Sequence, residues 1–403
     1  MTAPHPSALR GRDVLVTGHT GFKGSWLALW LAALGARTTG YALAPETDPA
    51  LFEVAGVADV LHDHVVGDVR DRDAVDAVVA RSRPDVVLHL AARTVVSEGY
   101  RRPAEAFSVN VDGTTAVLDA VRAADRPCAV VVVTSDKCYL NDESGRPFRE
   151  TDPLGGHDPY SASKAAQELV VQSYRRSYFD PQAQAAAGCP VVRLASGRAG
   201  NVIGGGDWTE DGLVADLARA PARGGELVLR SPHAVRPWQH VLEPLSGYLT
   251  LAAALLQDDA DALAGAYNFG PHPEDDATVA ELVDGLSTAW GPLADGSRGW
   301  RSEPHEDLGH EAGVLRLDVE LAARALSWTP TWRLGETLGR TADWYRGFGA
   351  EPASARDLCR EDIAAFEGAV SGSATRGRAG AGPGPSRSDA DSSRSSGDVT
   401  PTG

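Results

Sequence analysis

The chain has 403 residues, of which 43% are hydrophobic, and a formal net charge of −17. That length and apolar content suffice for one large or two medium domains and exclude a fibrous or disordered chain. The acidic charge argues against nucleic acid or an anionic membrane as a partner, because proteins that bind these present a basic surface. Four scattered cysteines without a C-x-x-C pair predict neither a disulfide framework nor a metal site. With no signal peptide or spanning segment in view, we expect a soluble cytoplasmic protein.

A β-branched run at Asp13–Thr17 stops at a glycine, and helical spacing of apolar residues begins near Lys23. The turn between them has glycines at G-x-x-G-x-x-G spacing. Missing side chains there let the backbone approach a pyrophosphate at the helix N-terminus. We therefore predict a dinucleotide site, with cofactor contacts from Gly18, Thr20, Gly21, Phe22, Lys23 and Gly24.

Strand and helix patterns then alternate, with strands expected at Arg37–Leu43, Val65–Asp68 and Asp85–Leu90 and helices at Asp71–Ala80 and from Pro103 to about Ala124. Repeated βα units predict an α/β fold: a Rossmann-type, doubly wound parallel sheet with ligands at the carboxyl edges of its strands. Further cofactor contacts are expected from Asp68, Val69, Leu90, Ala91 and Ala92.

Two of these assignments leave alternatives open. Asp68 could reach an adenine edge or simply form a strand-end turn. No carboxylate follows the second strand until Glu46. The sequence therefore shows no preference for NAD over NADP at the strand end where an acidic residue usually binds the ribose.

The apolar run Val130–Val133 predicts a buried strand that ends in Thr134-Ser-Asp-Lys. Tyr160 and Lys164 follow one helical turn apart, so their side chains project from one face. A nearby ammonium lowers the pKa of a phenol, which lets Tyr160 take a proton from a sugar hydroxyl while hydride leaves the same carbon. The alternative is a surface pair on a helix.

Asp136 and Lys137 indicate which reaction accompanies the hydride transfer. Eliminating water across two carbons needs a proton donor and a base, and an adjacent carboxylate and amine can divide those tasks; the alternative is an ordinary loop ion pair. The predicted catalytic residues are Ser135, Asp136, Lys137, Tyr160 and Lys164, with Thr134, Tyr160 and Lys164 also contacting the cofactor.

Beyond residue 190 glycine and proline become more frequent, which is typical of a smaller, mixed substrate-binding lobe. We expect a cofactor domain over 10–190, a mainly substrate-binding region over 191–350 with segments returning to the first domain, and a disordered tail over 371–403. Arg236 suits a diphosphate, while the tryptophans could flank a nucleotide or pack in the core. The predicted substrate contacts are Asn201, Asp207, Trp208, Arg236, Trp238 and Asn268. His240 is expected to be structural, and Asn110 to fix backbone near the Tyr160 helix.

The glycine turn, Ser135, Tyr160 and Lys164 resemble the extended short-chain dehydrogenase/reductase superfamily. More narrowly, the strings beginning at Thr17, Thr134, Arg198 and Arg236 resemble the CDP-glucose 4,6-dehydratases of the NAD-dependent epimerase/dehydratase family, over about residues 10–346. The resemblance implies NAD as cofactor, a nucleotide-diphosphate sugar as substrate and a homodimer. It also implies an internal redox cycle: Tyr160 deprotonates the sugar 4-hydroxyl as C4 hydride leaves, Asp136 protonates the departing 6-hydroxyl, Lys137 helps remove the C5 proton, and hydride returns to C6.

One loop departs from that family's pattern. Arg93 stands where the family usually has Gln, Ser97 where it has Arg, and Gly99 where it has Ser. An epimerase, or a dehydratase of another nucleotide-diphosphate hexose, therefore stays open as the alternative function. A non-catalytic nucleotide sensor is a third possibility, against which Tyr160 and Lys164 both argue.

Overall fold

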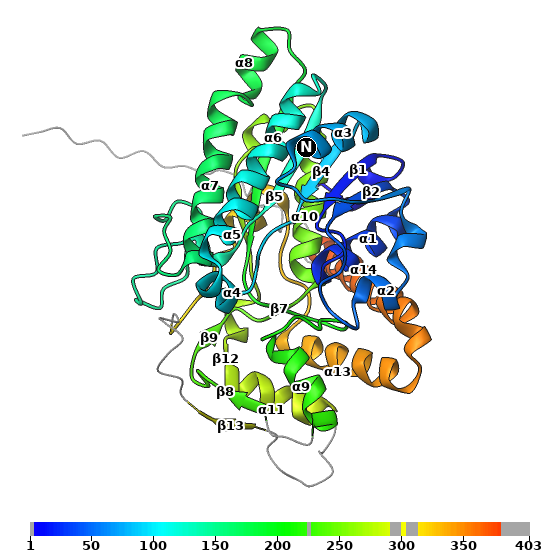
Figure 1. Ribbon diagram of the computed structural model, residues 1–403, viewed down its shortest axis with the longest axis vertical. Helices are drawn as coiled ribbons and strands as arrows, with labels where there is room; N and C mark the ends of the chain where they lie inside the picture. The colour runs from blue at the N-terminus through cyan, green and yellow to red at the C-terminus, as the bar shows by residue number, and fades with distance from the viewer. Residues whose placement is uncertain (1–3, 224–226, 291–299, 304–312, 380–403) are drawn as a thin grey trace, which may run out of the picture.

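In the computed structural model of the protein the described residues are 4–223, 227–290, 300–303 and 313–379. Within these ranges a seven-stranded parallel sheet forms the centre of the molecule, with helices on both faces and a smaller lobe at one end (Figure 1). The strand order is β11-β6-β5-β4-β1-β2-β3. The strands are β1 (Asp13–Thr17), β2 (Arg37–Ala42), β3 (Asp63–Val66), β4 (Val86–His89), β5 (Cys128–Val133), β6 (Val192–Ala199) and β11 (Ala266–Phe269). The predicted doubly wound α/β fold is confirmed.

Alternate residues of the buried strands face two separate apolar cores. In β5, Val131 and Val133 belong to one core and Val130 and Val132 to the other, because successive side chains of a strand point to opposite faces. Helices from distant parts of the sequence cover each face (Figure 1). The first core is covered by α1 (Phe22–Leu34), α10 (Leu242–Leu255) and α14 (Ala355–Ala379), and the second by α3 (Arg72–Ser82), α6 (Gly113–Ala123) and α7 (Pro159–Ser177).

The helix expected from Pro103 to about Ala124 forms as three joined segments. They are α5 (Pro103–Phe107), a π-helical turn η3 (Ser108–Asp112) and α6. The wider turn carries Asn110, whose Oδ1 accepts from the backbone N–H of Arg93 at 2.8 Å and whose Nδ2 donates to the Arg93 carbonyl at 3.1 Å and to Ser163 Oγ at 2.8 Å. Asn110 thus fixes the loop after β4 against α7, as predicted.

The second half of the chain contributes to both parts of the molecule. Strands β6 and β11 complete the sheet, and α10 packs against it. The lobe and its connections contain β7 (Val202–Ile203), α9 (Leu213–Arg223), β8 (Leu227–Leu229), β9 (Val235–Arg236), β10 (Gln239–His240), β12 (Ala277–Thr278), α11 (Val279–Trp290), β13 (Trp300–Ser302), α12 (Glu320–Leu326) and α13 (Leu334–Ala350). Short elements elsewhere are η1 (Pro6–Leu9), α2 (Leu51–Val54), η2 (Val57–Val60), α4 (Val96–Arg101), η4 (Asp136–Cys138), α8 (Pro181–Ala186), η5 (Asp261–Leu263), η6 (Pro273–Asp275) and η7 (Pro352–Ser354).

The last described helix extends into the range predicted as a tail. Disorder was expected from 371, but α14 continues through Ala379. The first half of this helix is anchored by Phe366, whose ring contacts Trp30 and Trp332 edge to face. Once a helix is nucleated by such packing, each further residue adds a hydrogen bond at low entropic cost, so α14 continues beyond the residues that anchor it. The prediction for 380–403 lies outside the described residues.

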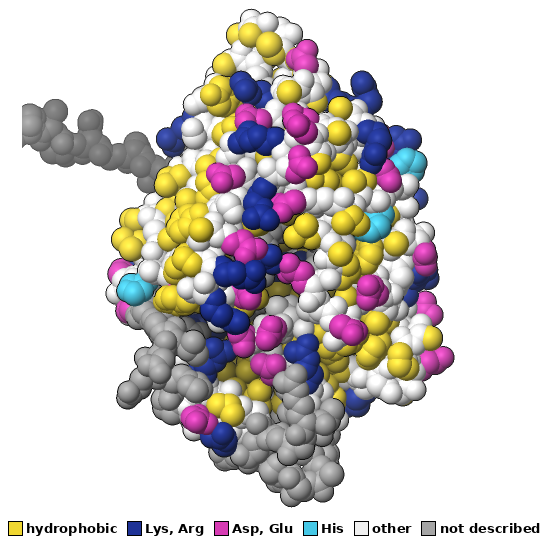
Figure 2. Space-filling model, in the orientation of Figure 1, with side chains coloured by type: hydrophobic (Ala, Val, Ile, Leu, Met, Phe, Trp, Pro, Cys, Tyr) yellow, Lys and Arg dark blue, Asp and Glu magenta, His cyan; other side chains and the backbone are white. Residues whose placement is uncertain are grey.

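Acidic and basic side chains are interspersed on the face drawn in Figure 2, with no broad patch of one sign. Among the described residues, no helix is both long and apolar enough to cross a membrane. The same ranges hold no cluster of three or more His, Cys, Asp or Glu placed to bind a metal ion.

The contact between α10 and β11 depends on a missing side chain at Gly247. A Cβ there would lie 2.3 Å from the Phe269 ring. Gly247→Ala should therefore destabilise the protein by about 1–3 kcal/mol through overpacking, measured by urea or thermal unfolding. Gly339→Ala, in α13 with no atom within 4 Å of the new Cβ, is the matched control and should be neutral or slightly stabilising. Equal stability of the two variants would contradict the packing described.

Candidate active site

A cavity of about 1000 Å³ opens at the carboxyl edge of the sheet, between the sheet and the lobe. It is lined by nearly all of the residues selected from the sequence. On the cofactor side these are Gly18, Thr20, Gly21, Phe22, Lys23, Gly24, Asp68, Val69, Leu90, Ala91, Ala92 and Thr134; at the centre Ser135, Asp136, Lys137, Tyr160 and Lys164; and on the lobe side Asn201, Asp207, Trp208, Arg236 and Trp238. Asn268 does not line it.

The glycine turn is built for a close backbone approach. Gly18 has a φ of 78°, and a Cβ on it would lie 2.7 Å from the Ala91 nitrogen, while a Cβ on Gly24 would lie 2.1 Å from the Gly18 carbonyl oxygen. Gly21 differs, because its Cβ would meet only the Gly18 oxygen, at 3.5 Å. It is the N-cap of α1, with no side-chain cap and no acidic residue in the first helical turn. The first N–H groups of α1 thus face the cavity beside a residue without a side chain, which fits the pyrophosphate of a dinucleotide.

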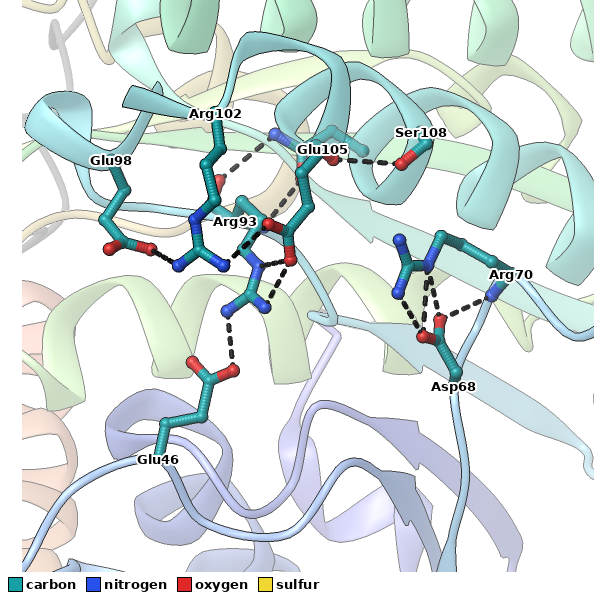
Figure 3. Close-up of polar contacts among 9 residues, drawn as sticks. Glu46, Asp68, Arg70, Arg93, Glu98, Arg102, Glu105 and Ser108 are labelled. Atoms are coloured by element: carbon teal, nitrogen blue, oxygen red, sulfur yellow. Dashed lines mark hydrogen bonds and ion pairs between the residues drawn. The ribbon is translucent and has the colours of Figure 1, made fainter. Parts of the chain in front are cut away.

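Asp68 and Val69 follow β3 at the cofactor end of the cavity. The Asp68 carboxylate forms an ion pair with Arg70, whose Nε lies 3.0 Å from both oxygens, and this partner lowers the pKa of Asp68. The Val69 side chain packs against Gly113, where an added Cβ would lie 2.7 Å from Val69 Cγ2. Asp68 therefore lines the cavity as expected, but its carboxylate is already held by Arg70 (Figure 3).

Arg93, the first departure from the family pattern, bridges two elements across the cofactor side of the cavity (Figure 3). Its Nη1 lies 2.5 Å from Glu46 in the loop after β2, and its Nε and Nη2 lie 2.9 and 2.5 Å from Glu105 on α5. The guanidinium lowers the pKa of Glu105. A glutamine carries no charge and could form no ion pair with either carboxylate, so Arg93 gives this chain an added electrostatic connection over the cofactor side.

The other two departures lie on α4, between the first domain and the lobe. Ser97 Oγ donates to Asp211 at 2.5 Å, which connects α4 to the loop before α9. Gly99 contacts the start of α7, because a Cβ there would lie 3.2 Å from both Cβ and N of Tyr160. The altered loop is therefore packed directly against the predicted catalytic helix.

Helix α7 presents Tyr160 and Lys164 at the centre of the cavity. Asp158 caps the helix by accepting from the Ser161 N–H at 3.0 Å. Both side chains are buried, and Lys164 Nζ donates to Gln167 Oε1 at 2.9 Å and to the Val133 carbonyl at 3.4 Å. Burial, followed by the charge of Lys23, lowers the pKa of Lys164 to about 7.

The expected lowering of the Tyr160 pKa by Lys164 is wrong for this structure. Burial raises the pKa of Tyr160, and the Ser135 hydroxyl is the group that opposes this rise. The ammonium is directed to Gln167 and Val133 instead. Sequence spacing placed the two residues on one helical face but could not reveal how strongly that face is desolvated.

Ser135, Asp136 and Lys137 follow β5 and form the start of η4. The Ser135 hydroxyl accepts from the Lys137 N–H at 3.2 Å and donates to Asp136 Oδ1 at 3.1 Å. Asp136 is 2% exposed, and its Oδ2 has no hydrogen-bond partner within the described ranges. Burial raises the pKa of Asp136 despite the opposing charges of Lys137, Arg236 and Lys23. Burial therefore shifts Asp136 toward its protonated form, the form that a proton donor needs.

On the lobe side, the predicted contacts divide into two groups. Arg236 is buried at the cavity wall, and Asn201 and Asp207 line it. Trp208 packs against Trp344, Tyr345 and Phe348, and Trp238 Nε1 donates to the Ala277 carbonyl at 3.2 Å. The two tryptophans thus belong to the core and to the cavity wall at once.

The assignment of Asn268 to substrate binding is corrected. Its Nδ2 donates to the carbonyls of Phe148 and Asp318 at 2.9 and 3.1 Å, and its Oδ1 accepts from the Tyr139 hydroxyl at 2.6 Å. These internal bonds direct the amide away from the cavity. His240 is structural, as expected: it is fully buried, accepts from the Leu242 N–H, and burial lowers its pKa to about 3.

Two relevant residues were missed. Arg230 lines the cavity and lies 3.8 Å from Asp211, and no motif surrounds it in the sequence. Glu168 lies one helical turn after Lys164 and accepts from Thr134 Oγ1 at 2.6 Å. Its spacing on the same face of α7 was the signal that could have found it.

A parallel sheet with a glycine turn after β1, a serine after β5 and a Tyr-x-x-x-Lys helix defines the class of nucleotide-dependent short-chain dehydrogenase/reductase enzymes. Residues 14–270 match the NAD dependent epimerase/dehydratase family. A CDP-glucose 4,6-dehydratase of Salmonella typhimurium is 45% identical over 84% of this chain and 92% of its own. A dTDP-glucose 4,6-dehydratase of Streptomyces antibioticus is 30% identical over 83% of this chain and 92% of its own.

Solved structures agree with the fold. A double mutant of a Streptomyces venezuelae dTDP-glucose 4,6-dehydratase, with NAD bound, superposes with a TM-score of 0.69 at 25% identity and covers 84% of this chain and 99% of its own. A UDP-glucose-4-epimerase of Stenotrophomonas maltophila, also with NAD bound, gives a TM-score of 0.70 at 22% identity, over 84% and 99% of the two chains. The chain belongs to the NAD dependent epimerase/dehydratase family.

The space at Gly21 allows a direct test of the cofactor position. Gly21→Ala introduces no clash within the protein, so its unfolding temperature should stay unchanged. If the pyrophosphate lies at this backbone, the new methyl group should weaken NAD binding by at least about tenfold, or about 1.4 kcal/mol, as measured by calorimetric titration. Gly349→Ala, which meets no atom within 4 Å, is the control. Unchanged NAD affinity in Gly21→Ala would place the cofactor elsewhere.

Proposed function

We propose that this protein is a CDP-glucose 4,6-dehydratase, which converts CDP-glucose to CDP-4-keto-6-deoxyglucose and water. The carrying observation is the buried Asp136 with Lys137 beside it, in the same cavity as Ser135, Tyr160 and Lys164. Epimerisation needs no proton donor for a leaving hydroxyl, whereas loss of water does. The 45% identity to the Salmonella enzyme supports the same substrate.

The proposed roles follow from the position and protonation of each group. Tyr160 accepts the proton of the sugar 4-hydroxyl as a phenolate; burial disfavours that form, and the Ser135 hydroxyl opposes the effect of burial on its pKa. Asp136, whose pKa is raised by burial, donates its proton to the 6-hydroxyl, which leaves as water. Lys137 takes part in removing the C5 proton, which the adjacent C4 carbonyl has made acidic. One proton leaves C5 and one joins the leaving hydroxyl, so the elimination is balanced.

NAD, held by the glycine turn and the groups after β3 and β4, would accept the hydride from C4 and return it to C6, while C5 regains a proton. Arg236 and Asn201 are proposed to bind the substrate diphosphate, with Asp207, Trp208 and Trp238 around the nucleotide. Arg236 supplies the positive charge that an anionic substrate needs, in a body whose overall charge is −17.

We further propose a homodimer that works in the cytoplasm. Phe107 on α5 and Leu169 on α7 are large apolar side chains, 39% and 56% exposed, on neighbouring helices, which suits a contact with a second copy. All four cysteines are unpaired, as expected in a reducing compartment.

The substrate assignment is tested by offering CDP-, dTDP-, UDP- and GDP-glucose in parallel with NAD and weighing the products. Loss of 18 mass units, about one water, from CDP-glucose alone is expected, without accumulation of NADH. The altered loop Arg93–Tyr100 supports the alternative function, an epimerase or a dehydratase of another sugar nucleotide. An isomer of unchanged mass would indicate an epimerase. Dehydration of another sugar nucleotide would show that CDP-glucose is not the substrate.

Asp136→Asn should separate the two halves of the reaction. The amide keeps the shape of the side chain but cannot donate a carboxylic proton, so water loss should fall by about 10²-fold or more, while C4 oxidation persists and enzyme-bound NADH accumulates at 340 nm. Asp142→Asn, an exposed carboxylate in the loop after η4, is the control. Dehydration at the normal rate in Asp136→Asn would remove Asp136 from the mechanism.

A further inference from the structure

A buried ion pair lies directly behind the catalytic residues. Glu168 of α7 and Arg198 of β6 are 0% and 1% exposed, with Glu168 Oε2 2.7 Å from Arg198 Nη2. Ser196 Oγ adds a bond to Glu168 at 3.0 Å. Two opposite charges without water are costly unless further hydrogen bonds satisfy them. The partners of those additional bonds indicate which parts of the site the ion pair holds in place.

The bonds from this pair hold both ends of the segment that carries Ser135, Asp136 and Lys137. Before the segment, Thr134 Oγ1 donates to Glu168 Oε1 at 2.6 Å. After it, Arg198 Nη1 donates to the Tyr139 hydroxyl at 2.9 Å, and the Arg198 guanidinium lies 5.0 Å from the Tyr139 ring centroid.

Tyr139 is fixed on its other sides as well. Its hydroxyl donates to Asn268 Oδ1 at 2.6 Å, and its ring stacks on Phe148 at 4.9 Å with the planes 4° apart. The bonds of Asn268 to Phe148 and Asp318 complete this anchor. The Tyr139 side chain is therefore held at a defined position, two residues after Lys137.

The same ion pair belongs to the helix of the redox residues. Glu168 lies four positions after Lys164 and eight after Tyr160, so all three project from one face of α7. We propose that Glu168, Arg198 and Tyr139 are positioning residues that hold the water-loss residues Asp136 and Lys137 in register with the hydride-transfer residues Tyr160 and Lys164. This inference rests on the proposed function, since it assigns the two residue sets to successive half-reactions.

The geometry predicts which half-reaction the loss of Tyr139 affects. Tyr139 directly follows the segment that carries Asp136 and Lys137, and its hydroxyl bonds to Arg198 and Asn268. Its loss should thus impair water loss and leave C4 oxidation almost unchanged. A purely structural role would slow both half-reactions alike or lower only the stability.

Tyr139→Phe is the sharpest test, because it keeps the ring stacking on Phe148 and removes only the hydroxyl that joins Arg198 to Asn268. In single-turnover reactions with CDP-glucose and NAD, the 4-keto-6-deoxy product should form at least about tenfold more slowly, since an ångström of misplacement can cost up to 10²-fold. C4 oxidation should stay within about twofold to threefold, so bound NADH should rise at 340 nm before it decays.

Tyr267→Phe is the matched control. Tyr267 is a buried tyrosine of β11 whose hydroxyl donates to the Leu263 carbonyl at 3.2 Å, away from the cavity. It should lose comparable stability without any NADH transient. Glu168→Gln, measured in the same way, serves if Tyr139→Phe does not fold, and a selective loss of dehydration is expected there too.

The outcomes separate this inference from the proposed function. If the wild-type protein does not dehydrate CDP-glucose, the proposed function fails. If the wild type dehydrates it but Tyr139→Phe slows oxidation and water loss equally, or leaves both unchanged, the positioning role is overturned and the proposed function stands.

Discussion

The parallel arrangement of the central sheet is the constraint on which the site depends. Because all seven strands described run in one direction, their carboxyl ends meet at one edge, and every loop that follows a strand opens there. The glycine turn after β1, Asp68 after β3, Arg93 after β4 and Ser135 after β5 are brought together for this reason. The close approach of Gly18 to the Ala91 backbone shows how tightly neighbouring loops are packed at this edge.

Burial dominates the electrostatics of that edge. Desolvation is the largest influence on the pKa values of Tyr160, Lys164 and Asp136, and in each case it favours the uncharged form. The deeper pair of Glu168 and Arg198 behaves differently, because mutual attraction and hydrogen bonds keep the pKa of Glu168 lowered and that of Arg198 raised. The cavity thus combines a desolvated reacting layer with a charged supporting layer behind it.

Sequence reasoning succeeded where local chemistry determines structure. The strand at Asp13–Thr17, the glycine turn and the pair Tyr160 and Lys164 follow from patterns a few residues long, and the cavity brings them together. It failed where tertiary contacts decide. Asn268 lies near the carboxyl end of β11, at the same edge of the sheet as the site, yet its amide bonds internally to Tyr139, Phe148 and Asp318. The Tyr160 pKa and the extent of α14 depend on burial and on packing by Phe366, neither of which is visible in a single sequence.

The π-helical turn at Ser108–Asp112 makes the orientation of the preceding helix depend on the number of residues in the turn. An α-helix advances about 100° per residue, so deleting one residue from this turn would rotate everything before it against α6. Asn110 would then lose its alignment with the Arg93 backbone and with Ser163, which it now joins. A substitution in this turn changes one side chain, whereas a single deletion would act at once on the loop after β4 and on α7. Related sequences should accordingly vary in composition here more readily than in length.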